Sequence, residues 1–86
     1  MANHASALKR ARQNEKRRMR NKSYRTRVRG AIKSVRQALE AKDQEAARAA
    51  LSAAEPIIDR AASKGVLPKR AASRKISRLA KQVHAL

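Results

Sequence analysis

The chain has 86 residues, a net charge of +17, and no Cys, Phe or Trp. Its length allows one domain at most, and the absence of Cys excludes disulfides and thiolate metal sites. No apolar run approaches the ~18 residues of a membrane span, and no apolar signal-peptide core precedes the charged residues that begin at Lys9. We therefore expect a soluble, cytoplasmic protein.

The positive charge is concentrated at the two ends of the chain. Residues 1–30 carry 11 cations and one anion, residues 31–62 carry five of each, and residues 63–86 carry seven cations and no anion. Self-repulsion on this scale destabilises a compact chain unless a partner of opposite charge neutralises it. The composition is also strongly helical, because the chain has 19 Ala but only two Gly and two Pro. These features predict a helical protein with a polyanionic partner.

Residues 6–42 are predicted to form one helix, with Ser6 as its N-cap or with a start a few residues earlier. From Tyr24 onward, apolar side chains recur on an arc of about 120°, at positions 24, 28, 31, 32, 35, 38 and 39. This stripe indicates a face that packs on a core. Before Tyr24 the stripe is absent, so residues 6–23 should extend about 27 Å beyond the packed part.

A second helix should begin at Asp43, which is a good N-cap, and end near Gly65, which suits a left-handed cap. Its apolar residues are spaced by four and three, at positions 47, 51, 54, 58 and 61. Pro56 lies inside this pattern. It removes one helical hydrogen bond and should kink the helix.

A third helix should open with Pro68 at its first helical position. Its apolar face is Ala72, Ile76, Leu79, Ala80 and Val83, and its cations fall on the opposite side. We therefore predict an all-α fold, an antiparallel three-helix bundle with a long N-terminal helix extending beyond the bundle. Residues 1–86 should form a single domain, with 6–23 as a basic helical extension and 24–86 as the bundle.

The stretch KRARQNEKRRMR, residues 9–20, has seven cations among its twelve residues. On a helix these cations point to all sides, whereas a membrane-surface helix needs a wide apolar face. One interpretation is a solvated, disordered basic tail. The other is a rod lying between nucleic-acid backbones, for which Arg is well suited because it binds phosphate bidentately. Stacking on bases is not expected, because Tyr24 is the single aromatic residue and falls on the core stripe.

Catalysis finds no support in the sequence. His4 and His84 lie at opposite ends, and no nucleophile, Gly-rich phosphate loop or metal-ligand spacing is present. We predict that the chain is not an enzyme, has no cofactor or small-molecule substrate, and does not bind membranes.

Two stretches carry a recognisable pattern. The first contains SA-x-KR-x-RQ at residues 6–13, and the second contains KG followed by A-[AS]-R-x-x-SRL over residues 64–79. In this order and spacing they resemble the bacterial-type small-subunit ribosomal protein family number twenty, from Asn3 to about Val83. Pro68 and Ile76 depart from the His and Lys of the family pattern. The resemblance implies a three-helix protein of the ribosome that binds 16S ribosomal RNA directly and helps the small subunit assemble.

The candidate RNA-binding residues are the cations of the first and third helices. In the first they are Lys9, Arg10, Arg12, Lys16, Arg17, Arg18, Arg20, Lys22, Arg25, Arg27 and Arg29, and toward the C-terminus Lys64, Lys69, Arg70, Arg74, Lys75 and Arg78. A structured RNA offers several converging backbones to a rod charged on all sides, which favours RNA over duplex DNA. Two alternatives stay open, namely a DNA-compacting architectural protein and a helical protein-interaction or membrane-active module.

Overall fold

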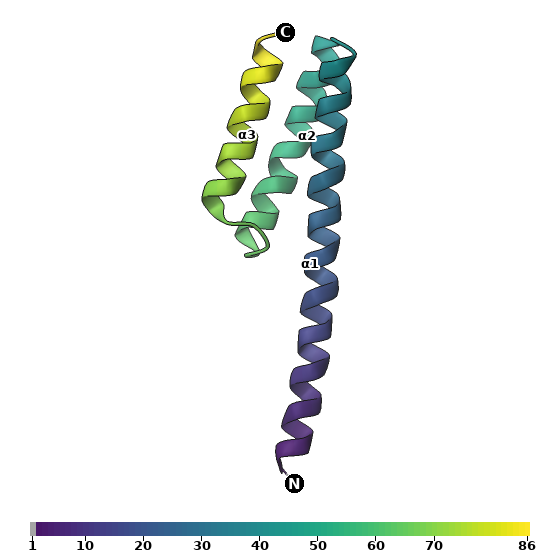
Figure 1. Cartoon of the computed structure of the whole chain (residues 1–86), viewed down its shortest axis with the longest axis vertical. Coiled ribbons are helices and arrows are strands. Elements are labelled where there is room, and N and C mark those ends of the chain that lie inside the picture. Colours follow the sequence, from purple (N-terminus) through teal and green to yellow (C-terminus); the bar gives the residue numbers. More distant parts are fainter. Residues whose placement is uncertain (1) are drawn as a thin grey trace.

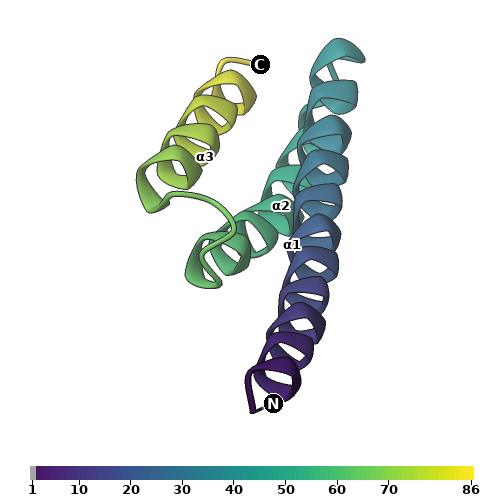
Figure 2. The same cartoon turned by 60° about the horizontal axis from the view of Figure 1, so that its bottom comes forward.

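The computed structural model describes the backbone of residues 2–86 and the side chains from residue 4 onward. The described chain forms three helices. They are α1 (Ala2–Glu40), α2 (Gln44–Ser63) and α3 (Lys69–His84). Each helix runs antiparallel to the one before it, and α2 lies between α1 and α3 (Figure 1); in the turned view α2 passes behind α1 (Figure 2). The first half of α1 projects beyond the other two helices, and the structure measures 63 × 21 × 14 Å. The prediction of an all-α fold with a long first helix is confirmed.

The turn between α1 and α2 begins earlier than the sequence predicted and occupies residues 41–43. Helix α1 ends at Glu40, two residues before the predicted end, because Lys42 adopts a left-handed φ of 54°. Its amide and that of Asp43 donate back to the carbonyls of Leu39 and Ala38, both at 3.1 Å. Asp43 is the N-cap of α2 as predicted, since its Oδ1 accepts a hydrogen bond from the Ala46 amide at 3.1 Å.

The start of α1 agrees with the earlier of the two predicted starts. The helix begins at Ala2, four residues before Ser6, so Ser6 lies inside its second turn and is not its N-cap. Four residues of strong or moderate helix propensity precede Ser6 and no breaker separates them from it, so nothing in the sequence stops the helix there.

In the loop between α2 and α3, Gly65 and Pro68 determine where α2 ends and α3 begins. Gly65 has a φ of 76°, a conformation that disfavours other residues, and the next amide, of Val66, donates to the Ala61 carbonyl at 2.9 Å. Pro68 is the N-cap of α3 and not its first helical residue, because its ψ of 138° is extended. Its carbonyl accepts from the Ala72 amide at 3.0 Å, so the helical bonding begins one residue later than predicted.

Helix α2 continues through Pro56 without interruption. The ring removes the amide that would have bonded the Ser52 carbonyl. Both Pro56 and Ser52 are exposed, so water can reach the unpaired carbonyl. The proline therefore stays on the solvent side of the helix while the buried face remains continuous.

The core is aliphatic and built around α2. All five predicted positions of α2 are buried, and its alanines at 47, 54 and 61 are 0% exposed, as are Val35 and Ile58. The predicted faces of α1 and α3 pack on it through Val28, Val35, Ala72, Leu79 and Val83, with the remaining stripe residues half-buried against them. One core residue, Val66, was missed because it lies in a loop and has no periodic neighbours. Small alanines on α2 allow both neighbouring helices to approach closely.

Packing stops partway along α1. Every described side chain from residue 4 to 20 is exposed, Asn21 and Tyr24 are half-buried, and Val28 is the first buried residue. The division into a 6–23 extension and a 24–86 bundle within one domain stays a prediction, to be tested by the melting of a chain shortened to residues 24–86.

Replacing Ala54 by Leu should lower the free energy of unfolding by about 1–3 kcal/mol, because three extra carbons must enter a fully packed site. Thermal or urea unfolding measures the loss. Ala53→Leu is the matched control, since Ala53 is the exposed neighbour on the same helix. Equal melts for the two variants would contradict the assignment of the buried face of α2.

Candidate nucleic-acid interface

The extension of α1 presents all but one of its cations without an ion-pair partner. All eleven predicted cations of α1, from Lys9 to Arg29, are exposed. Within residues 4–86 the one ion pair joins Arg18 Nη2 to Glu15 Oε1 at 2.8 Å, and both side chains are more than half exposed. Such an exposed pair on a helix surface stabilises little and is screened by salt. The charge of the extension is therefore available to a ligand.

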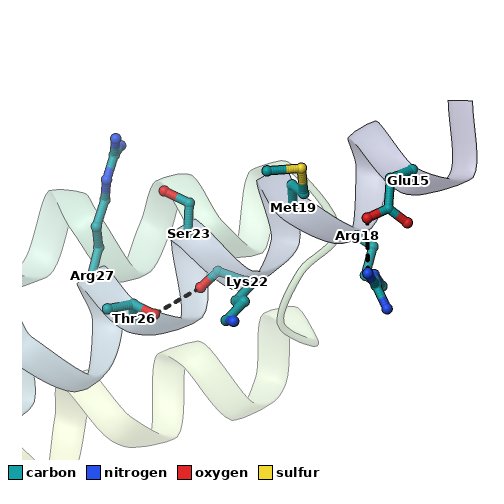
Figure 3. Close-up of a pocket in the computed structure, with 7 residues that line it drawn as sticks. All are labelled: Glu15, Arg18, Met19, Lys22, Ser23, Thr26 and Arg27. Atoms are coloured by element: carbon teal, nitrogen blue, oxygen red, sulfur yellow. Dashed lines mark hydrogen bonds and ion pairs between the residues drawn. The ribbon is translucent and has the colours of Figure 1, made fainter. Parts of the chain in front are cut away.

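A hollow beside Met19 shows how open this surface is. Seven side chains of α1, among them Met19, Thr26 and Arg27, line a volume of about 690 Å³ (Figure 3). All of them come from one helix, so they cannot enclose a small molecule. The Arg27 guanidinium lies 5.7 Å from the centroid of the Tyr24 ring, a cation–π contact that partly engages this cation. Tyr24 packs on the core, as the sequence predicted.

The second predicted set lies on and just before α3. Lys69, Arg70, Arg74, Lys75 and Arg78 are exposed on the helix, and Lys64 is exposed in the loop that precedes it. These cations face solvent while Ala72, Leu79 and Val83 face α2. Helix α3 is thus amphipathic, and its apolar face is buried in the bundle.

The two predicted sets meet in a groove between α1 and α3. One stretch, of about 280 Å³, is lined by Ile32 and Arg36 of α1 and by Lys75, Arg78, Leu79 and Gln82 of α3. The adjoining stretch, of about 520 Å³, adds Arg29, Lys33, Gln37 and Glu40 of α1. We call the two together the α1–α3 groove. The structure therefore places Lys75 beside Arg29 in one stretch and beside Arg78 in the other. The cations from Lys9 to Arg20 lie on the projecting half of α1, away from α3 (Figure 1).

Lys33 and Arg36 line this groove and were not among the predicted residues. Counting charge by segment hid them, because residues 31–62 are neutral in sum. Placed at ~100° per residue, they continue one row on α1 within an arc of about 80°, which is made of Arg18, Lys22, Arg25, Arg29, Lys33 and Arg36. The helical spacing of these cations in the sequence could have identified Lys33 and Arg36 as members of the row.

None of the described helices combines the length and the apolar character needed to cross a lipid bilayer. Among the side chains of residues 4–86, no group of three His, Asp or Glu is placed to hold a metal ion.

Comparison with known proteins identifies the family of the chain. The family model of ribosomal protein S20 matches residues 2–84. The small ribosomal subunit protein bS20 of Desulfatibacillum aliphaticivorans is 58% identical over 86 residues, which cover 100% of this chain and 98% of the relative. Proteins of the same name from Geobacter metallireducens and Syntrophobacter fumaroxidans are 55% and 51% identical, over 100% of this chain and 99% and 100% of the relatives.

These relatives are named as proteins of a ribosomal subunit, which are structural and not catalytic, so the prediction that the chain is not an enzyme is confirmed. The resemblance seen in residues 6–13 and 64–79 is confirmed as well, since the match extends over the full length. The chain belongs to the ribosomal protein S20 family.

Proposed function

We propose that this protein is a structural component of the small ribosomal subunit, in the cytoplasm, and that it binds 16S ribosomal RNA directly through α1 and α3. The observation that carries the proposal is the extension of α1, whose cations surround the helix and have one ion pair among them. A helix charged on all sides is suited to a cavity where several phosphate backbones converge. The relatives, which are small-subunit proteins, support the same partner.

The mechanism follows from electrostatics. RNA backbones that converge in a folded subunit repel one another, and cations placed between them lower that repulsion. Each phosphate that a Lys or Arg neutralises also releases condensed counterions, which favours binding and makes it depend on salt. Arg adds paired hydrogen bonds to the phosphate oxygens. The candidate residues of α1 and α3 would in this way stabilise the compact RNA during assembly, while α2, which carries two cations and three anions, takes no part.

The main rival is a DNA-compacting protein, which would also use exposed cations and shape. Competition between folded 16S RNA and duplex DNA at matched salt separates these two functions, because a ribosomal RNA-binding protein should prefer the RNA. Equal affinity would favour the rival. A membrane-active or protein-binding module would instead bind anionic vesicles in a manner that survives high salt, and the exposed cations of the extension argue against this.

Replacing Arg17 and Arg18 by Gln should weaken binding to protein-free 16S RNA roughly tenfold and flatten the slope of log K against log salt by about 1.5, because two phosphate contacts are lost. Neither residue touches the core, so the melt should stay within about 0.5 kcal/mol of the parent. Filter binding over a salt series and thermal unfolding give both values.

The matched control replaces two exposed arginines of α2, Arg48 and Arg60, by Gln. It removes the same charge from a surface outside both candidate sets, so the RNA affinity should change less than twofold. If the Arg17 and Arg18 variant keeps its salt slope and loses stability instead, the extension serves the fold and the proposal fails.

A further inference from the structure

The α1–α3 groove has a composition that suits a negatively charged polymer. Its walls carry five exposed cations and one anion, Glu40. None of the five takes part in an ion pair, since the single pair within residues 4–86 lies at Arg18 and Glu15. An acidic or phosphate-bearing ligand would be attracted to this groove, and a basic or neutral one would not.

The floor and the walls of the groove differ in chemistry. Ile32 is half-buried and Leu79 is 6% exposed, so the floor between the two helices is apolar. Gln82 from α3 and Gln37 from α1 add amide groups beside the cations. An apolar floor accepts the carbon face of a sugar, amides accept or donate to hydroxyls, and cations bind phosphates. These three properties together match a sugar–phosphate chain.

The cations on the α1 wall form a row along the helix and not a single cluster. Arg29, Lys33 and Arg36 span about 10 Å along the helix at 1.5 Å per residue. The same row continues down α1 to Arg18, over a total of about 27 Å. A single phosphate ion would engage one or two of these groups, whereas a polymer of phosphates engages the row. Lys75 and Arg78 face the row from the other wall of the groove.

We propose that the α1–α3 groove binds one sugar–phosphate backbone of RNA, and that Lys33, Arg36 and Gln82 are contact residues in addition to the candidate residues predicted from the sequence. The inference rests on the proposed RNA binding and deepens it. The strand lies between the two helices, with its phosphates toward Arg36 on one wall and Arg78 on the other, and its sugars over Ile32 and Leu79. The carboxylate of Glu40, at the end of the groove, repels the phosphates of the strand.

The first experiment replaces Lys33 and Arg36 by Gln and measures affinity for protein-free 16S RNA over a salt series. Both side chains are exposed, so folding should persist, as a thermal melt verifies. We expect roughly tenfold weaker binding and a slope flatter by about 1.5, as for two lost phosphate contacts. The control is again the pair Arg48→Gln and Arg60→Gln, which should bind like the parent.

The second experiment increases affinity and so does not depend on a loss of folding. Glu40→Gln removes the one anion of the groove and should tighten RNA binding two- to fivefold, as expected for one weakened repulsion at an exposed site. Glu45→Gln, an exposed anion on α2, removes the same charge elsewhere and should have a smaller effect.

The outcomes distinguish failure of the groove proposal from failure of the proposed function. If the parent binds 16S RNA and the Lys33 and Arg36 variant binds as tightly as the α2 control, the groove proposal is overturned while the proposed function stands. Equal effects of Glu40→Gln and Glu45→Gln also overturn it. If the parent shows no preference for 16S RNA, the proposed function itself fails. Loss of protection along one strand of the RNA footprint, confined to the groove variant, supports the proposal.

Discussion

In the free protein at low salt, the backbone amides of residues 9–20 should exchange hydrogen at least about 100-fold faster than those of residues 31–39. Every side chain from residue 4 to 20 is exposed, so no tertiary contact holds this half of α1. Like charges at i,i+4 spacing, such as Arg12 and Lys16, oppose the helix further. Residues 31–39 instead include Val35, which is 0% exposed. Amide exchange followed by NMR or mass spectrometry measures both segments.

Binding to 16S RNA should remove this difference. Phosphates neutralise the repulsion and add charge-assisted hydrogen bonds, so residues 9–20 become protected on the complex. The cost of ordering them reduces the net affinity, as in other cases of coupled folding and binding. High salt without RNA serves as the control, because it screens the repulsion but supplies no hydrogen bonds. Equally slow exchange of the two segments in the free protein would show that the extension is preformed.

Replacing Ile58 by Ala should destabilise the protein by about 2–5 kcal/mol. Ile58 is among the largest fully buried side chains, at 0% exposed, and lies on the face of α2 that builds the core. A domain of this size has a total stability of roughly 4–13 kcal/mol, so the variant should melt tens of degrees lower or fail to fold at 37 °C. Circular dichroism during heating or urea titration gives the value.

The neighbouring residue supplies the matched control. Ile57 is half-buried and packs only against the edge of the core, so Ile57→Ala removes the same atoms from a site that water already reaches. Its loss of stability should be less than half that of Ile58→Ala. A reversed order would mean that α2 is rotated by one residue from the orientation described.

Periodicity predicted the helices well, because each buries a face and burial imposes a spacing of three and four on the apolar residues. The seven stripe positions of α1 and the five of α2 are the ones that pack. Junctions were less accurate for a local reason. Lys42 is a good helix former, and only its role in the tight turn forces it into the left-handed conformation. Val66 in the loop has no period to reveal it.

The candidate site was predictable to the extent that it depends on one helix. The cations of the extension stand out as a block, and so do those of α3. The α1–α3 groove depends on how two distant segments are placed, and the sequence contains no direct record of that. Lys33 and Arg36 lie on the side of α1 next to Ile32, and only the position of α3 shows that this side faces a second row of cations.

The order of the helices has a kinetic consequence. Helix α2 lies between α1 and α3 (Figure 1), so each helix packs mainly on its neighbour in the sequence, and α1 and α3 touch little. Helical bundles of this kind fold in microseconds to milliseconds. Synthesis proceeds at about 5–20 residues per second, so α2 and α3 require roughly 2–9 s after α1 is complete. The extension therefore emerges seconds before the helices that complete the core, and synthesis, not folding, determines when the bundle is ready.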